Sequence, residues 1–421
     1  MLIRSLYSLL LLLAAPFMLY SLYKKKPSKP AFGSRWQEHF GNTPPLSTDS
    51  KPIWIHAVSV GESLAAIPLI KAIKAKNRQQ MIVVTTTTST GAEQIAKLGD
   101  LVEHRYMPFD FSFAVRSFLR AIKPAKLLII ETELWPNTLK TVHKANIPII
   151  VVNARLSEKS LRNYAKFKPL FNLIHPCLSK VLCQTQADAD RFAQLGVAHD
   201  KLNVTGSIKF DIYIDDEVKI KGSELRTQLG QDRFIWIAAS THKGEDEQVL
   251  EAHQKILAAH PDALLILVPR HPERFNDVFN LCQQEGFNTV RRTSGLVTTE
   301  TTQVYLGDTM GEMLILLSTA DICFMGGSLL GDKVGGHNVL EPAALGIPII
   351  TGPSYYNFKE IIGAMIESNA IFIAQDNIDI IKYISKLIKN NESYSSMAMK
   401  ASQFIKNNQG SLTRTIHLME L

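Results

Sequence analysis

The chain has 421 residues, of which 46% are hydrophobic and 20% are charged. Its length is too great for one ordinary core, and its composition excludes a disordered or collagen-like chain, so two globular domains are expected. The net charge of +7 fits an anionic partner such as a phospholipid surface or a phosphorylated substrate, whereas no run of base-stacking aromatic residues with Arg points to nucleic acid.

The N-terminal segment is apolar. Ser5 to Tyr23 carries no charge, and Lys24 to Lys26 follows it. This length is near the minimum that crosses a bilayer core, and Pro16 would kink or shorten the helix. A cleaved signal peptide is the alternative, but only Arg4 precedes the apolar run and no A-x-A site appears. Residues 1–26 are predicted to form a membrane anchor that spans or lies in the interface, with the rest of the chain in the cytoplasm.

Strand and helix patterns alternate over residues 27–210. This alternation is typical of a parallel sheet with helices on both faces. The expected strands end in polar loops, where such sheets bind their ligands. They are the segments "PIWIHAVSV", "QMIVVTTTT", "LVEHRYMPFD", "KLLIIETELW", "IPIIVVNAR" and "KVLCQTQAD".

A second series of the same kind fills residues 211–421, after an Asp-rich break at Val204 to Glu217. The sequence therefore predicts two doubly wound, Rossmann-like α/β domains in tandem, with a ligand cleft between facing strand ends. A last helix at Ser393 to Leu421 is a candidate for crossing back to the first domain. The expected strands are "FIWIAAST", "ALLILVPRHP", "TQVYLGDTMGE", "ADICFMGGS", "IPIITGP" and "AIFIA".

Acidic and basic side chains follow the strands of the first domain. Glu62 follows the first strand, in a loop where many nucleotide-binding folds hold a phosphate, and its carboxylate would repel one. Glu131 and Glu133 are expected on one face of a strand end, so that they could act together. Arg155 is expected at the same edge, where it could meet an acidic group, and Lys209 is expected at the domain junction, facing the cleft. The alternative for Glu62 is an acid that interacts only with the helix dipole, and the alternative for each of the other groups is a structural salt bridge.

The second domain carries the most specific stretch, "FMGGSLLGDKVGGHNVLEPAALGIPIITGP". Gly326 and Gly327 end a strand where backbone can approach a ligand closely. The segment Gly335 to Asn338 would offer N–H groups and a helix dipole to an anion. Glu341, one turn into that helix, could accept hydrogen bonds from a ribose. The alternative is a glycine-rich turn with a capped helix.

Two more loops of the second domain complete a predicted nucleotide pocket. Arg270 and His271 follow one strand, and Arg can pair with a phosphate or stack on a base. Met310 to Glu312 follow another. The alternatives are an interdomain salt bridge for Arg270 and helix capping by Asp308 or Thr309 for the other loop.

Metal sites are not expected. The pair Asp188-Ala-Asp190 matches a D-x-D pattern that binds metal with nucleotide diphosphates, but acidic residues are common in the first turn of a helix. The cysteines have no zinc spacing, so buried free thiols are expected. They are Cys177, Cys183, Cys282 and Cys323.

Taken together, the motifs resemble those of the 3-deoxy-D-manno-octulosonic acid (Kdo) transferases of Gram-negative lipopolysaccharide assembly. The resemblance implies an inverting glycosyltransferase of the GT-B fold at the inner membrane, with CMP-Kdo as donor and lipid IVA as acceptor. The matching strings keep their order along most of the chain. They are "HAVSVGE", "TTTTSTG", "ETELWPN", "NARLS", "TGSIKFD", "ASTHKGE", "PRHPERF", "GDTMGE" and "GGHNVLEP".

The resemblance also implies roles for individual residues. Glu62 matches the catalytic base, while Glu131 and Lys209 match positions that stabilise the transition state. The family has a shorter segment with an Arg where this chain has Leu330 to Val334, in which Lys333 is the only cation. Contacts with CMP are implied for Pro269, Arg270, Met310, Gly311, Glu312, Asn338, Val339, Leu340 and Glu341.

This assignment gives Glu62 a chemical task. A helix N-terminus lowers a carboxylate's pKa, so Glu62 is expected to be ionised at pH 7 and to take a proton from a sugar hydroxyl. That hydroxyl would attack the anomeric carbon from the face opposite CMP, with inversion. Arg270, Lys209 and the helix at Gly336 are expected to balance the charge of the leaving phosphate, without a metal or other cofactor.

Two other functions remain open from the sequence. A nucleotide-sugar epimerase can use the same fold, but it needs no lipid acceptor and no apolar N-terminal segment. A catalytically inactive membrane scaffold would be expected to lack Glu62 or Arg270, and both are present.

Overall fold

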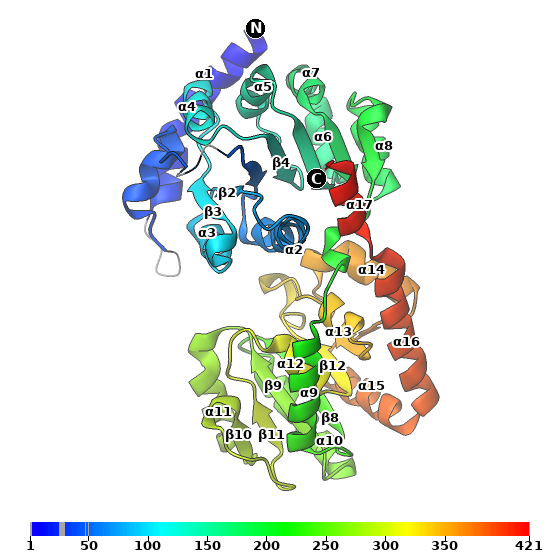
Figure 1. Ribbon diagram of the computed structural model, residues 1–421. Helices are drawn as coiled ribbons and strands as arrows, with labels where there is room; N and C mark the ends of the chain where they lie inside the picture. The colour runs from blue at the N-terminus through cyan, green and yellow to red at the C-terminus, as the bar shows by residue number, and fades with distance from the viewer. Residues whose placement is uncertain (1, 25–29, 47, 49, 421) are drawn as a thin grey trace. The chain divides into compact units, whose positions relative to one another are not determined.

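A computed structural model describes residues 2–24, 30–46, 48 and 50–420, which excludes Lys25 and Lys26 of the predicted anchor. The chain divides into two compact units. Unit 1 comprises Met1–Asp211 and Gln409–Leu421, and unit 2 comprises Ile212–Asn408. Figure 1 follows the chain through each unit in turn.

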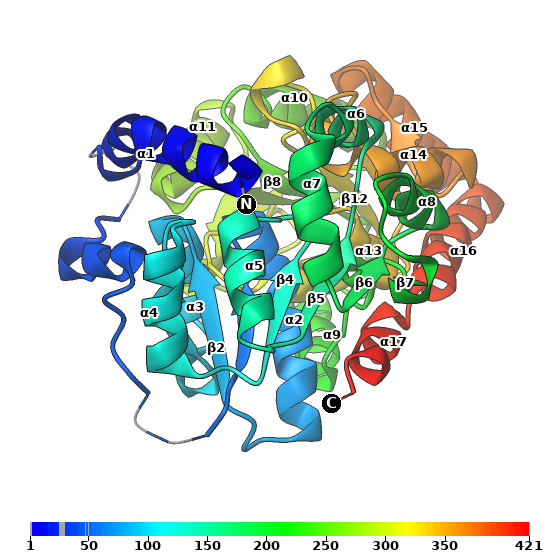
Figure 2. The same ribbon diagram turned by 90° about the horizontal axis from the view of Figure 1, so that it is seen from above.

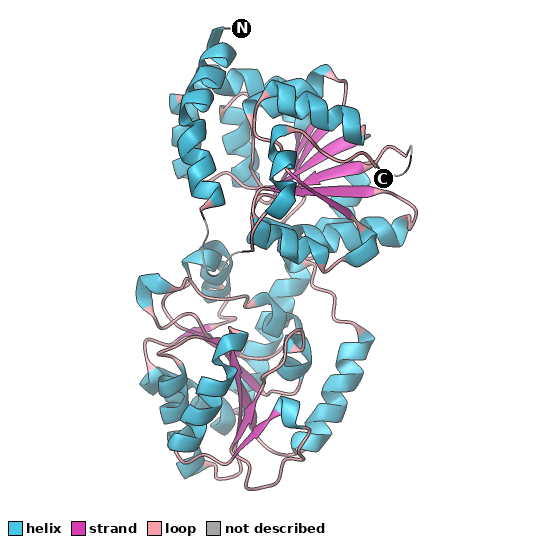
Figure 3. Ribbon diagram, turned by 90° about the vertical axis from the view of Figure 1, so that its left-hand side faces the viewer, coloured by secondary structure: helices cyan, strands magenta, loops and turns pink. Residues whose placement is uncertain are grey.

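Unit 1 is a seven-stranded parallel sheet in the order β3-β2-β1-β4-β5-β6-β7. Helices cover both of its faces (Figure 3). Strands β1 and β2 are buried along their whole length and are mostly apolar because neither face of the sheet meets water. The strands are β1 (Ile53–His56), β2 (Ile82–Thr86), β3 (Glu103–Tyr106), β4 (Lys126–Ile130), β5 (Ile149–Ala154), β6 (Lys180–Cys183) and β7 (Leu202–Val204).

The helices of unit 1 begin where polar side chains cap them. Ser59 caps α2, Thr88 caps α3 and Thr185 caps α8. The helices are η1 (Gly33–Phe40), α2 (Val60–Lys76), α3 (Ser89–Ala96), α4 (Ser112–Ile122), α5 (Pro136–Lys144), α6 (Glu158–Lys166), α7 (Lys168–Ile174), α8 (Gln186–Gln194) and η5 (Ile208–Phe210).

Unit 2 has a second seven-stranded parallel sheet, in the order β10-β11-β9-β8-β12-β13-β14. Its strands are β8 (Ile235–Thr241), β9 (Leu264–Pro269), β10 (Thr289–Arg291), β11 (Val304–Leu306), β12 (Ile322–Met325), β13 (Ile349–Thr351) and β14 (Phe372–Ile373). Its helices are α9 (Asp216–Leu229), α10 (Asp246–Ala259), α11 (Phe275–Gln284), α12 (Met313–Ser318), α13 (Leu340–Ala344), α14 (Lys359–Glu367), α15 (Asn377–Lys389) and α16 (Asn391–Asn408). The prediction of two doubly wound α/β domains is confirmed.

The C-terminal segment belongs to unit 1. The single helix predicted over Ser393–Leu421 is wrong, because Gly410, with φ of 86°, separates α16 from α17 (Ser411–Leu418). Asp211 accepts hydrogen bonds from the N–H groups of Gly410 and Leu412, each at 2.6 Å. The α17 helix packs against α2.

The N-terminal helix α1 (Leu2–Tyr23) packs against α5 and α7 of unit 1 (Figure 2). Within the described residues it is the one helix that is long and apolar enough to cross a membrane. Its window Ile3–Tyr20 has a mean hydropathy of 1.6, and none of that window is buried.

A buried carboxylate fixes the loop after β12 in unit 2. Glu245 Oε2 accepts from the N–H groups of His242 (3.0 Å) and Gly327 (2.7 Å), while Oε1 accepts from Ser328 (2.8 Å) and Leu329 (3.0 Å). These N–H groups of the glycine loop are therefore engaged within unit 2, and the close approach of its backbone to a ligand stays a prediction. A Cβ on Gly327 would lie 2.6 Å from the His337 ring, so the glycine serves packing.

We expect Glu245→Gln to lower the free energy of unfolding of unit 2 by about 3 kcal/mol, because an amide can accept from only part of this set of buried donors. Urea unfolding measures the change. Glu285→Gln, at an exposed position of the same unit, is the control. Equal stability of the two variants would contradict the structural role of the Glu245 carboxylate.

Candidate functional site

The strand order of unit 1 reverses between β1 and β4. These neighbouring parallel strands are followed by loops that lead away in opposite directions, and such a point is where doubly wound sheets bind ligands. Glu62 follows β1, and Glu131 and Glu133 follow β4. The fold thus brings the carboxylates predicted from the sequence to one end of one sheet.

Glu62 lies in the first turn of α2 and is 8% exposed. Its Oε2 accepts from the Val58 N–H at 2.7 Å, and its Oε1 accepts from the Ser59 hydroxyl at 3.0 Å. Ser59 in turn is the N-cap of α2. The carboxylate therefore holds the loop in place, and each of its oxygens has a further lone pair for another donor.

The prediction that the helix N-terminus lowers the pKa of Glu62 is wrong. Burial is the largest cause, and together with the charges of Glu133 and Glu131 it raises this pKa to about 7, although the hydrogen bonds from Val58 and Ser59 oppose the shift. The loss of water therefore outweighs the hydrogen bonds that stabilise the charged form. Near neutral pH the group therefore exchanges its proton readily, which suits a general acid or base.

Glu131 and Glu133 do not lie on one face of a strand, because β4 ends at Ile130 and Glu131 has a left-handed φ of 62°. Glu131 forms an ion pair with Lys209 at 3.1 Å. Glu133 accepts from the Trp135 indole N–H at 3.1 Å, and burial raises its pKa. The two carboxylates are electrostatically coupled but have different partners.

Asp188 has a structural role. Its Oδ1 accepts from the Leu156 N–H at 2.9 Å, and its Oδ2 accepts from the Thr185 hydroxyl at 2.6 Å in a capping box at the start of α8. Asp190 is exposed and accepts from Gln186. Over the described part of the chain, no group of three or more His, Cys, Asp or Glu side chains could hold a metal ion.

In unit 2 the strand order reverses between β8 and β12. His242 follows β8, and its Nε2 lies 2.8 Å from the Nε2 of His337, with the two rings stacked. The His271 ring contacts His242 edge-on. Sequence reasoning missed His242, although its motif "THKGE" directly follows a buried strand.

The His242 and His337 imidazoles lie near the charge of Arg270. Burial lowers the pKa of His337 to about 3, and the charge of Arg270 adds to that effect. Burial also lowers the pKa of His242. Arg270 follows the buried Pro269 at the end of β9 and is exposed. This edge of the sheet therefore presents a guanidinium together with ring N–H groups, which suits an anion.

The helix predicted near Gly336 begins later. It is α13, which starts at Leu340, so that Glu341 is its second residue. The Gly336 N–H donates to the Gly327 carbonyl at 2.8 Å, and the Leu340 N–H donates to Asn338 Oδ1 at 3.1 Å. These two N–H groups therefore already donate hydrogen bonds within the chain.

The side chains at α13 form a polar pair. Asn338 donates to Glu341 at 3.1 Å, and burial raises the pKa of Glu341, an effect that Asn338 and the Arg270 charge oppose. Val339 and Leu340 are buried. The predicted residues Arg270 and Glu341 thus share one electrostatic environment.

The predicted loop Met310 to Glu312 is fixed by an ion pair at its last residue. Arg292 forms an ion pair with Glu312 at 3.0 Å, and this hydrogen bond lowers the pKa of Glu312. Met310 is 62% exposed, and Gly311 has φ of 86°. Glu312 is therefore an ionised group that fixes the start of α12.

The longer segment Leu330 to Val334 forms a short turn. The Ser354 hydroxyl lies 2.6 Å from the carbonyl oxygens of both Gly331 and Val334, and the Tyr356 hydroxyl donates to the Asp332 carbonyl at 3.3 Å. The extra residues thus fold against the loop after β13.

Comparisons with known proteins agree with this architecture. A family model described as 3-deoxy-D-manno-octulosonic-acid transferase matches residues 34–212, and one for glycosyl transferases group 1 matches residues 224–404. A UDP-GlcNAc 2-epimerase structure from Neisseria meningitidis is 14% identical with a TM-score of 0.54, covering 87% of this chain and 100% of its own. At that identity the likeness shows the fold alone, which is that of GT-B enzymes.

Relatives of known activity match nearly the whole chain. The 3-deoxy-D-manno-octulosonic acid transferase of Haemophilus influenzae is 39% identical over 99% of this chain and 98% of its own length. The enzyme of the same name from Bordetella pertussis is 33% identical over 88% of this chain and 87% of its own. This chain therefore belongs to the 3-deoxy-D-manno-octulosonic acid transferase family of glycosyltransferases.

Proposed function

We propose that this protein transfers Kdo from CMP-Kdo to the lipid A precursor lipid IVA, with inversion at the anomeric carbon and with Glu62 as general base. The observation that carries the base assignment is the buried Glu62 carboxylate at the strand-order reversal of unit 1, with its pKa raised to about 7. Family membership favours this activity over that of an epimerase, because the fold alone is common to both.

The reaction needs a base on the acceptor. An acceptor hydroxyl loses its proton to Glu62 as its oxygen forms a bond to the anomeric carbon of Kdo, and the bond from that carbon to the CMP phosphate oxygen breaks. A carboxylate with a pKa near 7 is a stronger base than one near 4, and about half of it is still ionised at pH 7.

The donor side needs positive charge for the leaving phosphate. In this proposal Arg270 pairs with the phosphate, while Pro269, Met310 and Gly311 line the path of the nucleotide. Lys209, held by Glu131, adds a cation at the reacting centre. Glu312 and the segment Asn338 to Glu341 complete the proposed CMP site, with Glu341 at the ribose.

The membrane and the cofactors complete the proposal. The acceptor is a lipid, so we place the enzyme at the cytoplasmic face of the inner membrane, held there by α1. Charge balance by Arg270 and Lys209 removes the need for a metal ion or another cofactor.

We expect Glu62→Gln to reduce turnover by about 10²- to 10⁴-fold, the usual contribution of a general base. CMP affinity should stay nearly unchanged, because the amide oxygen can still accept from Val58 and Glu62 belongs to unit 1. Transfer of radiolabel from CMP-Kdo into lipid measures the first quantity, and calorimetry with CMP measures the second. Glu93→Gln, exposed on α3, is the control. Near-normal turnover in Glu62→Gln would refute the base assignment and make Glu131 the next candidate.

The pH dependence of turnover follows from the same pKa. The base must be deprotonated, so kcat should fall about tenfold for each pH unit below about 7 and level off above it. Stopped assays with saturating donor and acceptor give this profile. A flat profile down to pH of about 5 would mean that Glu62 stays ionised or does not act.

Activity should survive EDTA, since the proposed cations belong to the protein and Asp188 is engaged in capping α8. Initial rates before and after dialysis against the chelator provide the test. A loss of rate that magnesium restores would show that a metal is used.

A further inference from the structure

Both ends of α1 are tied to unit 1. At its N-terminal end, Arg4 Nε donates to Asn137 Oδ1 at 2.7 Å, and the Arg4 guanidinium also contacts Ser112. The Tyr7 hydroxyl donates to Asp110 at 2.9 Å, and Asn137 donates to the Ser8 hydroxyl at 3.0 Å. The polar residues of this end are thus satisfied by the protein.

The receiving groups are rigid. Asp110 is buried and accepts from the backbone N–H groups of Asn137 (3.0 Å) and Thr138 (2.6 Å) at the start of α5. Asn137 is 1% exposed and also donates to the Asp110 carbonyl at 2.8 Å. The helix therefore docks onto a preformed buried network.

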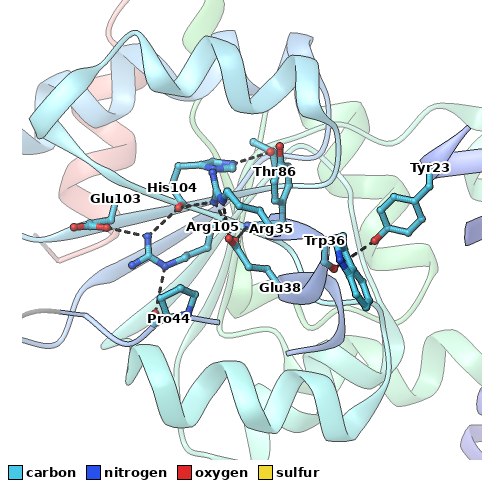
Figure 4. Close-up of polar contacts among 10 residues, drawn as sticks. Tyr23, Arg35, Trp36, Glu38, Pro44, Thr86, Glu103, His104 and Arg105 are labelled. Carbon is cyan, nitrogen blue, oxygen red and sulfur yellow. Dashed lines mark hydrogen bonds and ion pairs between the residues drawn. The ribbon is translucent and has the colours of Figure 1, made fainter. Parts of the chain in front are cut away.

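The C-terminal end of α1 docks elsewhere on the same unit. The Tyr23 hydroxyl lies 2.5 Å from Nδ1 of His39 in η1. It also lies 3.4 Å from the carbonyl oxygen of Trp36 in the same helix (Figure 4). Glu38 fixes η1 to strand β3 by accepting from the Tyr106 N–H at 2.6 Å. Arg35 reinforces this contact by binding both Glu38 and the His104 carbonyl (Figure 4).

The length of α1 determines what these contacts imply for its orientation in a membrane. Its 22 residues rise about 33 Å, which is close to the thickness of a hydrocarbon core of about 30 Å. If α1 crossed the bilayer, its two ends would lie on opposite sides of the membrane. Unit 1 holds both ends, and a water-soluble α/β unit cannot reach both sides.

We propose that α1 does not span the membrane but lies along its surface, with its exposed side chains among the acyl chains and unit 1 on one side only. This inference rests on the proposed membrane location of the enzyme. The apolar surface that α1 leaves uncovered is large for a water-soluble protein. It consists of Ile3, Leu6, Leu9, Leu10, Leu12, Leu13, Phe17, Met18 and Tyr20.

The surrounding charge fits an anionic lipid surface. The helices α5 and α7 pack against α1, while α4 packs against α5 and α6 packs against α7. Glu158 is the one acidic residue of these four helices. Their basic residues can attract anionic headgroups at about 1 kcal/mol each near the surface. These are Arg116, Arg120, Lys140, Lys144, Lys159, Arg162, Lys166 and Lys168, and the exposed Phe113 and Phe167 accompany them.

The side of the membrane on which the N-terminus lies provides the first test. A short cysteine-containing tag fused before Met1 marks the N-terminus, and Asp200→Cys, exposed on unit 1, marks the folded domain. The four native cysteines are buried and give little background. In intact spheroplasts, a membrane-impermeant maleimide should label neither marker, and after lysis it should label both. Labelling of the tag but not of Asp200→Cys in intact spheroplasts would overturn the proposal.

Docking in the membrane provides the second test. Ser8→Cys with Asn137→Cys should form a disulfide under copper–phenanthroline in isolated membranes, whereas Phe17→Cys with Asn137→Cys should not. Phe17 is 80% exposed and is the matched control on the same helix. Absence of the first crosslink in a protein that still binds CMP would contradict the docked helix. If Asn137→Cys fails to fold, the tag experiment still tests whether α1 spans the membrane, because it leaves the hydrogen bonds of Asn137 and Asp110 unchanged.

Vesicle binding tests whether lipid covers the exposed apolar side chains of α1. The detergent-free full chain should float with vesicles of phosphatidylethanolamine and phosphatidylglycerol, and Leu9→Asn with Leu13→Asn should abolish flotation. Ile220→Asn, exposed in unit 2, should not. A stable dimer that the α1 substitutions dissociate, without vesicle binding, would show that a second copy covers this face. Because none of these measurements uses Kdo transfer, they stand whether or not the proposed reaction is correct.

Discussion

The candidate sites depend on one constraint. The first strand of each sheet pairs with another strand on both of its sides. In unit 1, β1 lies between β2 and β4, and in unit 2, β8 lies between β9 and β12. Parallel strands buried on both faces leave polar side chains only at their ends. Glu62, Lys209 and Glu131 gather at one such end, and His242, His337 and Arg270 at the other.

Desolvation sets the chemistry at these ends. Glu62 holds its loop as a cap does, yet the same burial that fixes its geometry raises its pKa to about 7. Burial shifts the pKa of His337 in the opposite direction. It favours the neutral imidazole, and the pKa falls to about 3. Unit 1 thus carries a carboxylate that can exchange protons, and unit 2 carries a neutral imidazole, and both properties arise from packing within the unit.

The sequence was sufficient to predict two parallel sheets and the strands at their centres, because a continuous apolar run followed by a polar loop is typical of a strand in a parallel sheet. It missed the short edge strands β7 and β10, which are only partly buried and have no such run. Prediction from the sequence failed where the hydrogen-bond partner of a side chain is far away along the chain. Nothing adjacent to Glu245 indicates that it binds the backbone of Gly327 and Leu329. The left-handed Glu131 and the late start of α13 also depend on tertiary contacts, and the pKa of Glu62 depends on how much protein covers it.

The return of the chain to unit 1 has a consequence for synthesis. Lys126 and Lys180, on the fourth and sixth strands, donate to the carbonyl oxygens of Met419 and Leu418, each at 2.8 Å. These partners leave the ribosome long after the strands that bind them, and all of unit 2 is made in between. Unit 2 is contiguous and can fold while translation continues. Unit 1 is therefore the first to begin synthesis and the last to be completed, and the surface that α17 covers stays exposed until the chain is finished.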